Sequence, residues 1–342
     1  MPVRHEPLEL RTIFEFRIAR GGKTVQRNTL VTFTHDGIEG LGEAAPSRYY
    51  GESPETVAVA LDAWAPAIGD DPFALEAILE RCTATLAGHD AARAALEMAL
   101  YDWQGKKLGM PVWKLLGLDR AKTPVSCVTL GMAEQGEMLA KLETVKAFPA
   151  IKVKLGGPGD VENLRCVRAH YDGRIQVDAN AAWDAASALR VLNEIAPLRI
   201  ELVEQPVARE DLDGLAFVRA RSPIPVFADE SCHHLADIAR LAGRVDGVNL
   251  KLMKTGGIRE ALRMIHAARA HGMQVMLGSM VESSLALSAA AQLAPLADYL
   301  DLDGHWLIAD DPFAGAPGEH GVIALSDAPG LGVTPAVAGS RA

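Results

Sequence analysis

Five short apolar runs recur between residues 150 and 253, and each carries a charged residue near its end: AIKVKLG (150–156), RIQVDAN (174–180), IELVEQP (200–206), PVFADES (225–231) and GVNLKLM (247–253). Their starts lie 22 to 26 residues apart, which is about the chain length of a strand, a helix and two short loops. Three runs of the same kind extend the series: VSCVTLG (125–131), QVMLGSM (274–280) and DYLDLDG (298–304). Eight parallel strands alternating with helices predict a closed α/β barrel with its active site at the strands' carboxyl ends.

An open, doubly wound sheet is the alternative fold. Such a sheet normally has a glycine-rich phosphate turn after its first strand. The end of VSCVTLG and the residues after it, VTLGMAEQG (128–136), match that turn poorly. The barrel is therefore the favoured architecture.

The residues before the barrel have a different pattern. Alternating and β-branched residues predict strands between residues 7 and 44, with a turn at His35-Asp36-Gly37. Ser53-Pro54-Glu55 predicts a helix start, and an apolar stripe predicts a second helix from Asp90 to about Gln104. The first 115 or so residues thus form a small α+β unit, whereas the segment after residue 305 predicts one or two strands and a frayed end.

Composition limits the class of protein. A chain of 342 residues suggests about two domains. Its net charge of -10 argues against nucleic acid or an anionic membrane as partner, and its apolar stretches are shorter than the roughly 20 residues of a membrane span. The start, MPVRHEPLEL, lacks a signal-peptide pattern, which predicts a cytoplasmic protein. The four cysteines form no CxxC pair and are expected to be reduced thiols.

Three acids, Asp178, Glu204 and Asp229, lie at matching points of three consecutive strands. A single acid there is often a helix N-cap, but three on adjacent barrel strands must converge. Converging carboxylates repel one another unless a cation lies between them. Oxygen ligands without nearby Cys or His favour Mg²⁺, with Mn²⁺ as the alternative.

Lysines flank these acids on both sides. Strand alternation points Lys152 and Lys154 to the same side, and Lys251 ends the sixth strand. Because the second and sixth strands of an eight-stranded ring face each other, Lys154 and Lys251 would approach a substrate from opposite faces. Two opposed bases beside a metal that binds a substrate carboxylate suit racemisation or epimerisation. The same site would catalyse elimination if the substrate carried a leaving group at the β-carbon.

Together, IKVKLG, VDAN, VEQP, ADES and NLKLMKTGGI resemble the muconate-lactonizing subgroup of the enolase superfamily over nearly the whole chain. The resemblance implies a modified (β/α)7β barrel, a TIM-type (β/α)8 variant, with an α+β capping domain. We expect the cap at 1–118, the barrel at 119–304 and a C-terminal segment returning to the cap at 305–342. The resemblance also implies one Mg²⁺ per subunit, bound by Asp178, Glu204 and Asp229. It implies Lys154 and Lys251 as the acid/base residues and Lys152 as the supporting lysine. Homo-oligomers are also implied.

Within the subgroup, Asp301-Leu302-Asp303-Gly304 resembles the motif with which dipeptide epimerases hold the substrate's α-ammonium. Strand alternation lets the two carboxylates share a cation; the alternative is that both acids are turn residues before Gly304. The cap segments 19–21 and 48–53 also resemble these enzymes, with Arg20, Lys23 and Arg48 as candidates for a substrate side-chain carboxylate. Cys127 stands where such epimerases often have Thr, and the loop 279–284, with Met280, is expected to set side-chain preference.

The sequence therefore predicts a Mg²⁺-dependent dipeptide epimerase acting on a small dipeptide, with L-Ala-D/L-Glu as the expected substrate and murein-peptide recycling as its role. The enzyme alternatives are N-acylamino-acid racemase, o-succinylbenzoate synthase and muconate cycloisomerase, whose substrates lack the free ammonium. A catalytically silent ligand-binding barrel is the non-enzyme alternative. The complete set of lysines and acids argues against it.

Overall fold

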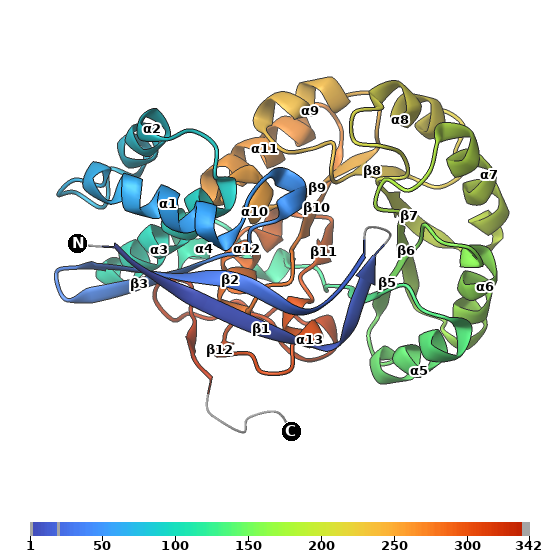
Figure 1. The fold of residues 1–342 in the computed structure, drawn as a ribbon, viewed down its shortest axis with the longest axis horizontal. Helices are drawn as coiled ribbons and strands as arrows, with labels where there is room; N and C mark the ends of the chain where they lie inside the picture. The colour runs from blue at the N-terminus through green and yellow to red at the C-terminus, as the bar shows by residue number, and fades with distance from the viewer. Residues whose placement is uncertain (1–2, 19–20, 337–342) are drawn as a thin grey trace.

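The N-terminal part of the chain is a three-stranded antiparallel sheet covered by helices (Figure 1). The computed structural model describes residues 3–18 and 21–336. The sheet has the order β1 (Val3–Ile18), β2 (Gly21–His35), β3 (Ile38–Ala44), and its turn at Asp36 and Gly37 has the positive φ angles that a tight hairpin needs. The helices are η1 (Arg48–Tyr50), α1 (Pro54–Trp64), η2 (Ala65–Ala67), α2 (Leu75–Thr85), α3 (Asp90–Leu108), α4 (Val112–Leu115) and η3 (Arg120–Lys122).

The predicted eight-stranded parallel barrel is confirmed. Its strands lie in chain order: β4 (Val128–Leu130), β5 (Ala150–Lys154), β6 (Arg174–Asp178), β7 (Ile200–Glu204), β8 (Val226–Ala228), β9 (Gly247–Lys251), β10 (Gln274–Gly278) and β11 (Tyr299–Asp301). The backbone N–H of Cys127 donates to the carbonyl of Leu300 at 2.9 Å, which brings the first and last strands together.

Helices alternate with the barrel strands and form an outer layer around them (Figure 1). They are α5 (Gln135–Val145), α6 (Asp160–His170), α7 (Ala185–Ile195), η4 (Ala196–Leu198), α8 (Leu212–Arg219), α9 (Leu235–Leu241), α10 (Leu252–Thr255), α11 (Ile258–Ala270), α12 (Ser284–Ala291) and η5 (Ala294–Leu296). The apolar faces of strands and helices form one large core, and Leu202, Phe227 and Met276 of the barrel strands form a separate small cluster.

After β11 the chain makes contacts with the N-terminal unit. This segment contains α13 (Gly304–Leu307), β12 (Phe313–Ala314), η6 (Glu319–Gly321) and β13 (Thr334–Pro335). The backbone N–H of Ala309 donates to the carbonyl of Arg11, and that of Leu331 donates to the carboxylate of Asp102 on α3.

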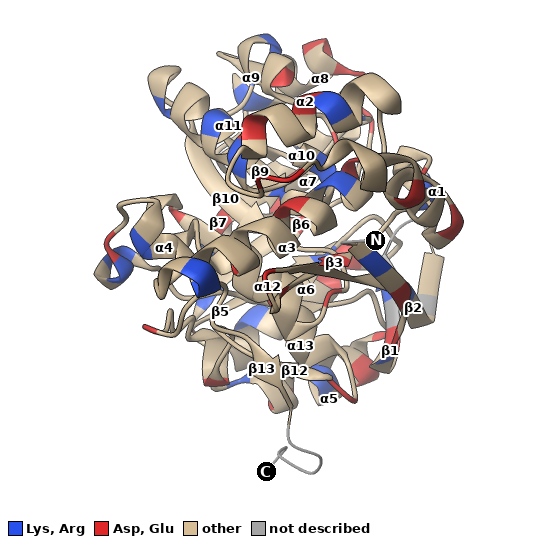
Figure 2. Cartoon of the chain, turned by 90° about the vertical axis from the view of Figure 1, so that its left-hand side faces the viewer, with Lys and Arg blue, Asp and Glu red and all other residues tan. Residues whose placement is uncertain are grey.

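Acidic and basic residues are interspersed on the outer helices in the view of Figure 2. None of the helices in the described part of the chain is both long and apolar enough to cross a bilayer.

Helix α3 is the joint between the cap and the barrel. A Cβ on Gly40 or Gly42 of β3 would lie 2.0 Å from a carbonyl oxygen of α3, so only glycine permits this close packing. On its other side, α3 buries Glu97 against the start of α11, where the backbone N–H of Arg259 donates to the Glu97 carboxylate at 2.7 Å. Burial raises the pKa of Glu97 to about 7.

This raised pKa makes the joint sensitive to pH. In the unfolded chain Glu97 has a pKa of about 4.3, so between about pH 4.3 and pH 7 the folded state keeps a proton that the unfolded state has lost. The free energy of unfolding therefore falls as the pH rises through this window. Replacing Glu97 with Gln keeps the acceptor oxygen and removes the ionisation. We expect Glu97→Gln to stabilise the protein by about 2 kcal/mol more at pH 8 than at pH 5.

Urea unfolding at both pH values measures this difference. Glu80→Gln, at an exposed position on α2, is the control and should show no such pH dependence. An equal effect of Glu97→Gln at both pH values would contradict the prediction.

Candidate active site at the carboxyl end of the barrel

The three acids predicted to converge do so. Asp178 ends β6, Glu204 ends β7 and Asp229 directly follows β8. Each offers a carboxylate oxygen, and these oxygens all lie within 4.8 Å of one another. All three residues are at most 1% exposed. Adjacent parallel strands thus bring together acids that are about 25 residues apart in the chain.

Two lysines of β5 contact this group from one side. The Nζ atom of Lys154 lies 2.5 Å from the Asp178 carboxylate. The Nζ atom of Lys152 lies 2.7 Å from Glu204 and 3.3 Å from Asp178. Both side chains point into the barrel mouth, as strand alternation predicted.

Lys251 contacts the group from the opposite side. It ends β9, the sixth barrel strand, and its Nζ atom lies 2.7 Å from the Asp229 carboxylate. Because β5 is the second strand of eight, Lys154 and Lys251 reach the acids from facing walls of the barrel.

Sequence reasoning missed Lys254, which is fully buried on α10. Its Nζ atom donates to the backbone carbonyls of Asp229 at 2.7 Å and Asn249 at 3.0 Å, and it also contacts the Asp229 carboxylate. Asn249, also missed, donates from Nδ2 to Glu204 at 2.9 Å. The only available signal was that both residues lie inside NLKLMKTGGI. Lys254 is three residues after Lys251, and Asn249 is two residues before it.

The surroundings shift the pKa values of the three acids in different directions. Burial acts to raise the pKa of Asp178, but the ammonium groups of Lys154 and Lys152 outweigh it and hold the pKa at about 2. Lys251 and Lys254 likewise hold the pKa of Asp229 well below its usual value against burial. Burial and the charge of Asp178 raise the pKa of Glu204 to about 8.

This difference in pKa fits a divalent cation. Four lysines contact the three buried carboxylates, yet burial and the charge of Asp178 still leave the pKa of Glu204 raised to about 8. Hard oxygen donors without imidazole or thiolate are the ligands that Mg²⁺ prefers. Asp178, Glu204 and Asp229 are therefore a donor set suited to Mg²⁺, which would replace the proton on Glu204.

Asp301 and Asp303 form a second acidic pair across the barrel mouth from these ligands. Asp301 ends β11 and accepts from Lys152 at 2.7 Å. Asp303 accepts from the backbone N–H of Thr129 at 2.6 Å. Burial and Asp301 raise the pKa of Asp303 to about 6. Against burial, the ammonium groups of Lys152 and Lys154 lower the pKa of Asp301.

Cys127, expected among the substrate contacts, lies beside the same acidic pair. Cys127 precedes β4, and its Sγ lies 3.3 Å from Asp301. The strand continues to Leu130, so Thr129, two residues further on and on the same side, lies nearer its carboxyl end. The chain thus has a threonine facing this acidic pair, and its hydroxyl lies 3.3 Å from Asp301.

The remaining predicted substrate contacts lie on loops. Met280 follows β10 and is half-buried, and its backbone N–H donates to Glu282 at 2.7 Å. Arg48 is exposed on η1. Arg20 and the side chain of Lys23 lie outside the residues that the structure describes.

A cavity of about 430 Å³ opens between the cap and the barrel loops. Tyr49 of η1 lines it from the cap, and Asn180 and Arg209 line it from the loops after β6 and β7. The Arg209 guanidinium lies 5.9 Å from the Tyr49 ring. The cap segment 48–53 therefore reaches the barrel mouth.

Comparisons with known proteins agree with this geometry. Residues 4–117 match the family model of the mandelate racemase / muconate lactonizing enzyme N-terminal domain, and residues 136–338 match the enolase C-terminal domain-like model. The chain belongs to the enolase superfamily. Within it, the chain is a member of the mandelate racemase / muconate lactonizing enzyme family.

Relatives include an L-Ala-D/L-Glu epimerase of Bacteroides thetaiotaomicron, 41% identical over 96% of this chain and 86% of the relative. The structure of the substrate-liganded L-Ala-D/L-Glu epimerase of Bacillus subtilis has a TM-score of 0.93 at 30% identity and covers 98% of both chains. A dipeptide epimerase of Enterococcus faecalis, in complex with Mg and L-Leu-L-Tyr, has the same TM-score at 33% identity, covering 97% of this chain and 99% of the other. This chain, too, is an enzyme of the isomerase class.

The three-carboxylate site predicts stabilisation by metal. Mg²⁺ at about 100 times its Kd should add about 2.7 kcal/mol to the free energy of unfolding and raise Tm by about 4 °C. Glu204→Gln removes one ligand charge and should lose most of this rise. Differential scanning fluorimetry with and without Mg²⁺ measures it, with Glu162→Gln, an exposed acid on α6, as the matched control. A full Mg²⁺ response in Glu204→Gln would contradict the assignment.

Proposed function

We propose that this protein is a Mg²⁺-dependent dipeptide epimerase that inverts the α-carbon of the substrate's C-terminal residue. The observation that carries the proposal is the placement of Lys154 and Lys251 on opposite strands around three converging carboxylates. When bound by Asp178, Glu204 and Asp229, Mg²⁺ supplies a Lewis acid that neutralises the substrate's carboxylate and makes the α-proton easier to remove.

The two lysines divide the proton transfer. One lysine, as the free amine, takes the α-proton from its face of the substrate, and the other, as the ammonium, gives a proton to the opposite face. The roles exchange when the epimer with the other configuration is the substrate. A planar α-carbon between two opposed acid/base groups therefore gives inversion, whereas a single lysine would return the proton to the face it left.

Lys152 keeps its charge throughout. Although burial acts against it, the carboxylates of Asp301, Glu204 and Asp178 raise its pKa well above the usual value. It therefore remains a fixed cation beside the substrate carboxylate and supports the negative charge that develops when the α-proton leaves.

Asp301 and Asp303 select a substrate with a free ammonium group. Both are at most 5% exposed. Asp301 is the last residue of β11, and Asp303 follows it by two residues. The backbone N–H of Thr129 orients the Asp303 carboxylate. A substrate ammonium between the two would make charge-assisted hydrogen bonds with both acids and lower the repulsion between them.

The proposed substrate is the small dipeptide L-Ala-D/L-Glu. The proposed role of the enzyme is murein-peptide recycling in the cytoplasm, and it is proposed to act as a homo-oligomer. Among the relatives, the protein of B. thetaiotaomicron is named for this dipeptide, whereas one from a Flavobacteria bacterium, 36% identical, is named a hydrophobic dipeptide epimerase. The presence of Arg20, Lys23 and Arg48 in the sequence of the cap favours a substrate with an acidic side chain.

An N-acylamino-acid racemase is the second candidate. An N-succinyl Arg/Lys racemase of Bacillus cereus has a TM-score of 0.93 at 29% identity. The buried pair Asp301 and Asp303 separates the two candidates, because an N-acylated substrate has no free α-ammonium to place between these acids.

Replacing Asp303 tests the substrate class. Asp303→Asn keeps the shape but removes one charge that faces the ammonium, so kcat/KM for L-Ala-D-Glu should fall at least about 100-fold. Turnover of an N-acylamino acid should not fall with it. The measurement is exchange of the α-proton into D₂O, followed by NMR over a panel of dipeptides and N-acylamino acids with Mg²⁺.

Asp310→Asn, an exposed acid nearby in the chain, is the matched control and should retain activity. Exchange confined to N-acylamino acids would overturn the dipeptide assignment. If the wild-type protein exchanged no member of the panel, a silent ligand-binding barrel would replace the epimerase.

A further inference from the structure

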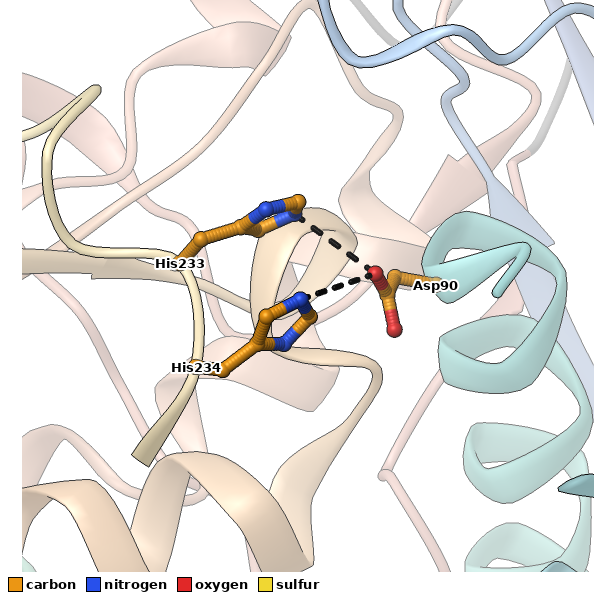
Figure 3. Close-up of side chains that lie close together, drawn as sticks. All are labelled: Asp90, His233 and His234. Atoms are coloured by element: carbon orange, nitrogen blue, oxygen red, sulfur yellow. Dashed lines mark ion pairs between the residues drawn. The ribbon is translucent and has the colours of Figure 1, made fainter. Parts of the chain in front are cut away.

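A second cluster of potential metal ligands lies away from the barrel mouth (Figure 3). Asp90 begins α3 in the cap, and His233 and His234 lie in the loop between β8 and α9. The Asp90 carboxylate oxygen Oδ2 lies 3.6 Å from Nε2 of His233 and 3.9 Å from Nε2 of His234. One oxygen from the cap therefore faces two imidazole nitrogens from the barrel.

The loop holds both histidines in place. Their backbone N–H groups donate to the same carboxylate oxygen of Asp237, at 3.0 Å for His233 and 2.9 Å for His234. The two rings stack with centroids 4.2 Å apart, and the Tyr50 ring lies 4.9 Å from that of His233. The side chains are thus presented together to Asp90.

The distances are too long for hydrogen bonds and close to those of metal ligands. Ligands about 2.0–2.1 Å from a tetrahedral ion are separated by about 3.4 Å from one another. In addition, the buried Nε2 atom of His233 has no hydrogen-bond partner among the described residues.

The protonation state also suits a metal. Burial, with the nearby charges of His234 and Lys254, lowers the pKa of His233 to about 4, so its ring is neutral at pH 7 and has a lone pair to donate. Burial raises the pKa of Asp90, although the nearby charges of His234 and Arg93 act to lower it. The side chain of His234 is 52% exposed, which leaves a path from solvent and a free position for water.

We propose that Asp90, His233 and His234 form a second metal site, for Zn²⁺ or a similar borderline cation, that ties the cap to the barrel. Two imidazoles and one carboxylate favour Zn²⁺ over Mg²⁺, in contrast to the all-carboxylate site at the barrel mouth. The loop that carries both histidines begins at Asp229, and Tyr50 contacts His233 from the cap segment that borders the barrel mouth. Metal at this site therefore fixes the cap segment relative to the β8–α9 loop.

Zinc content measured on the untagged, full-length protein tests this site. The protein is dialysed against Zn²⁺ with Mg²⁺ in large excess, and bound zinc is determined by mass spectrometry of the metal. His234→Asn is the main variant, because Asn is a good N-cap residue and preserves the start of α9. His233→Gln is the second variant, and His266→Asn, an exposed histidine on α11, is the control.

We expect wild type and His266→Asn to bind one more equivalent of zinc than either variant of the cluster. Zinc should also raise Tm by about 4 °C at 100 times its Kd in wild type, and less in the variants. Co²⁺ at this site should give the intense visible absorption of a tetrahedral complex with imidazole ligands, which an octahedral site with oxygen ligands lacks. Equal zinc content in wild type and both variants would overturn the proposal, and the Asp90–histidine contact would then be an ion pair only.

Discussion

The balance of buried charge around Lys152 is the constraint on which the barrel mouth depends. Its ammonium group is 1% exposed and lies within 3.3 Å of carboxylates from three strands, those of Asp178, Glu204 and Asp301. Buried charges are tolerated only when they are paired. Lys152 therefore links the proposed metal ligands to the acids proposed to bind the substrate ammonium. A neutral side chain at this position would leave both groups of carboxylates without their shared counterion.

The fold makes this balance possible by bringing the charges from many strands to one end of the barrel. The rest of each strand is apolar and buried. Burying a charge costs free energy, and pairing with an opposite charge offsets this cost only where the carboxyl ends of the strands meet. The cap completes the enclosure: α3 packs on β3 through glycines, Tyr49 lines the opening, and the C-terminal segment holds Asp102 of α3 through Leu331. The second cluster, Asp90 with His233 and His234, lies at this same joint.

Much of this arrangement was predictable from the sequence, because strand alternation and an interval of about 25 residues are properties of the local chain. They predicted the eight strands, the convergence of Asp178, Glu204 and Asp229, and the opposition of Lys154 and Lys251. Contacts that depend on how far a strand runs were less predictable. Thr129 rather than Cys127 lies nearer the end of β4, and Lys254 reaches Asp229 only because α10 begins directly after β9. Pairings across the cap and barrel, such as Asp90 with His233, have no signal in sequence spacing.

The central claim is that two lysines act on opposite faces of one substrate. The most direct test is the stereochemistry of proton exchange in Lys154→Ala and Lys251→Ala. Each variant is incubated in D₂O with Mg²⁺ and either the L,L or the L,D dipeptide, and NMR follows both exchange and inversion. If the two lysines act on opposite faces, neither variant inverts its substrate, and each still exchanges the α-proton of one epimer, a different one for each variant. Inversion by either variant, or exchange of the same epimer by both, would contradict it.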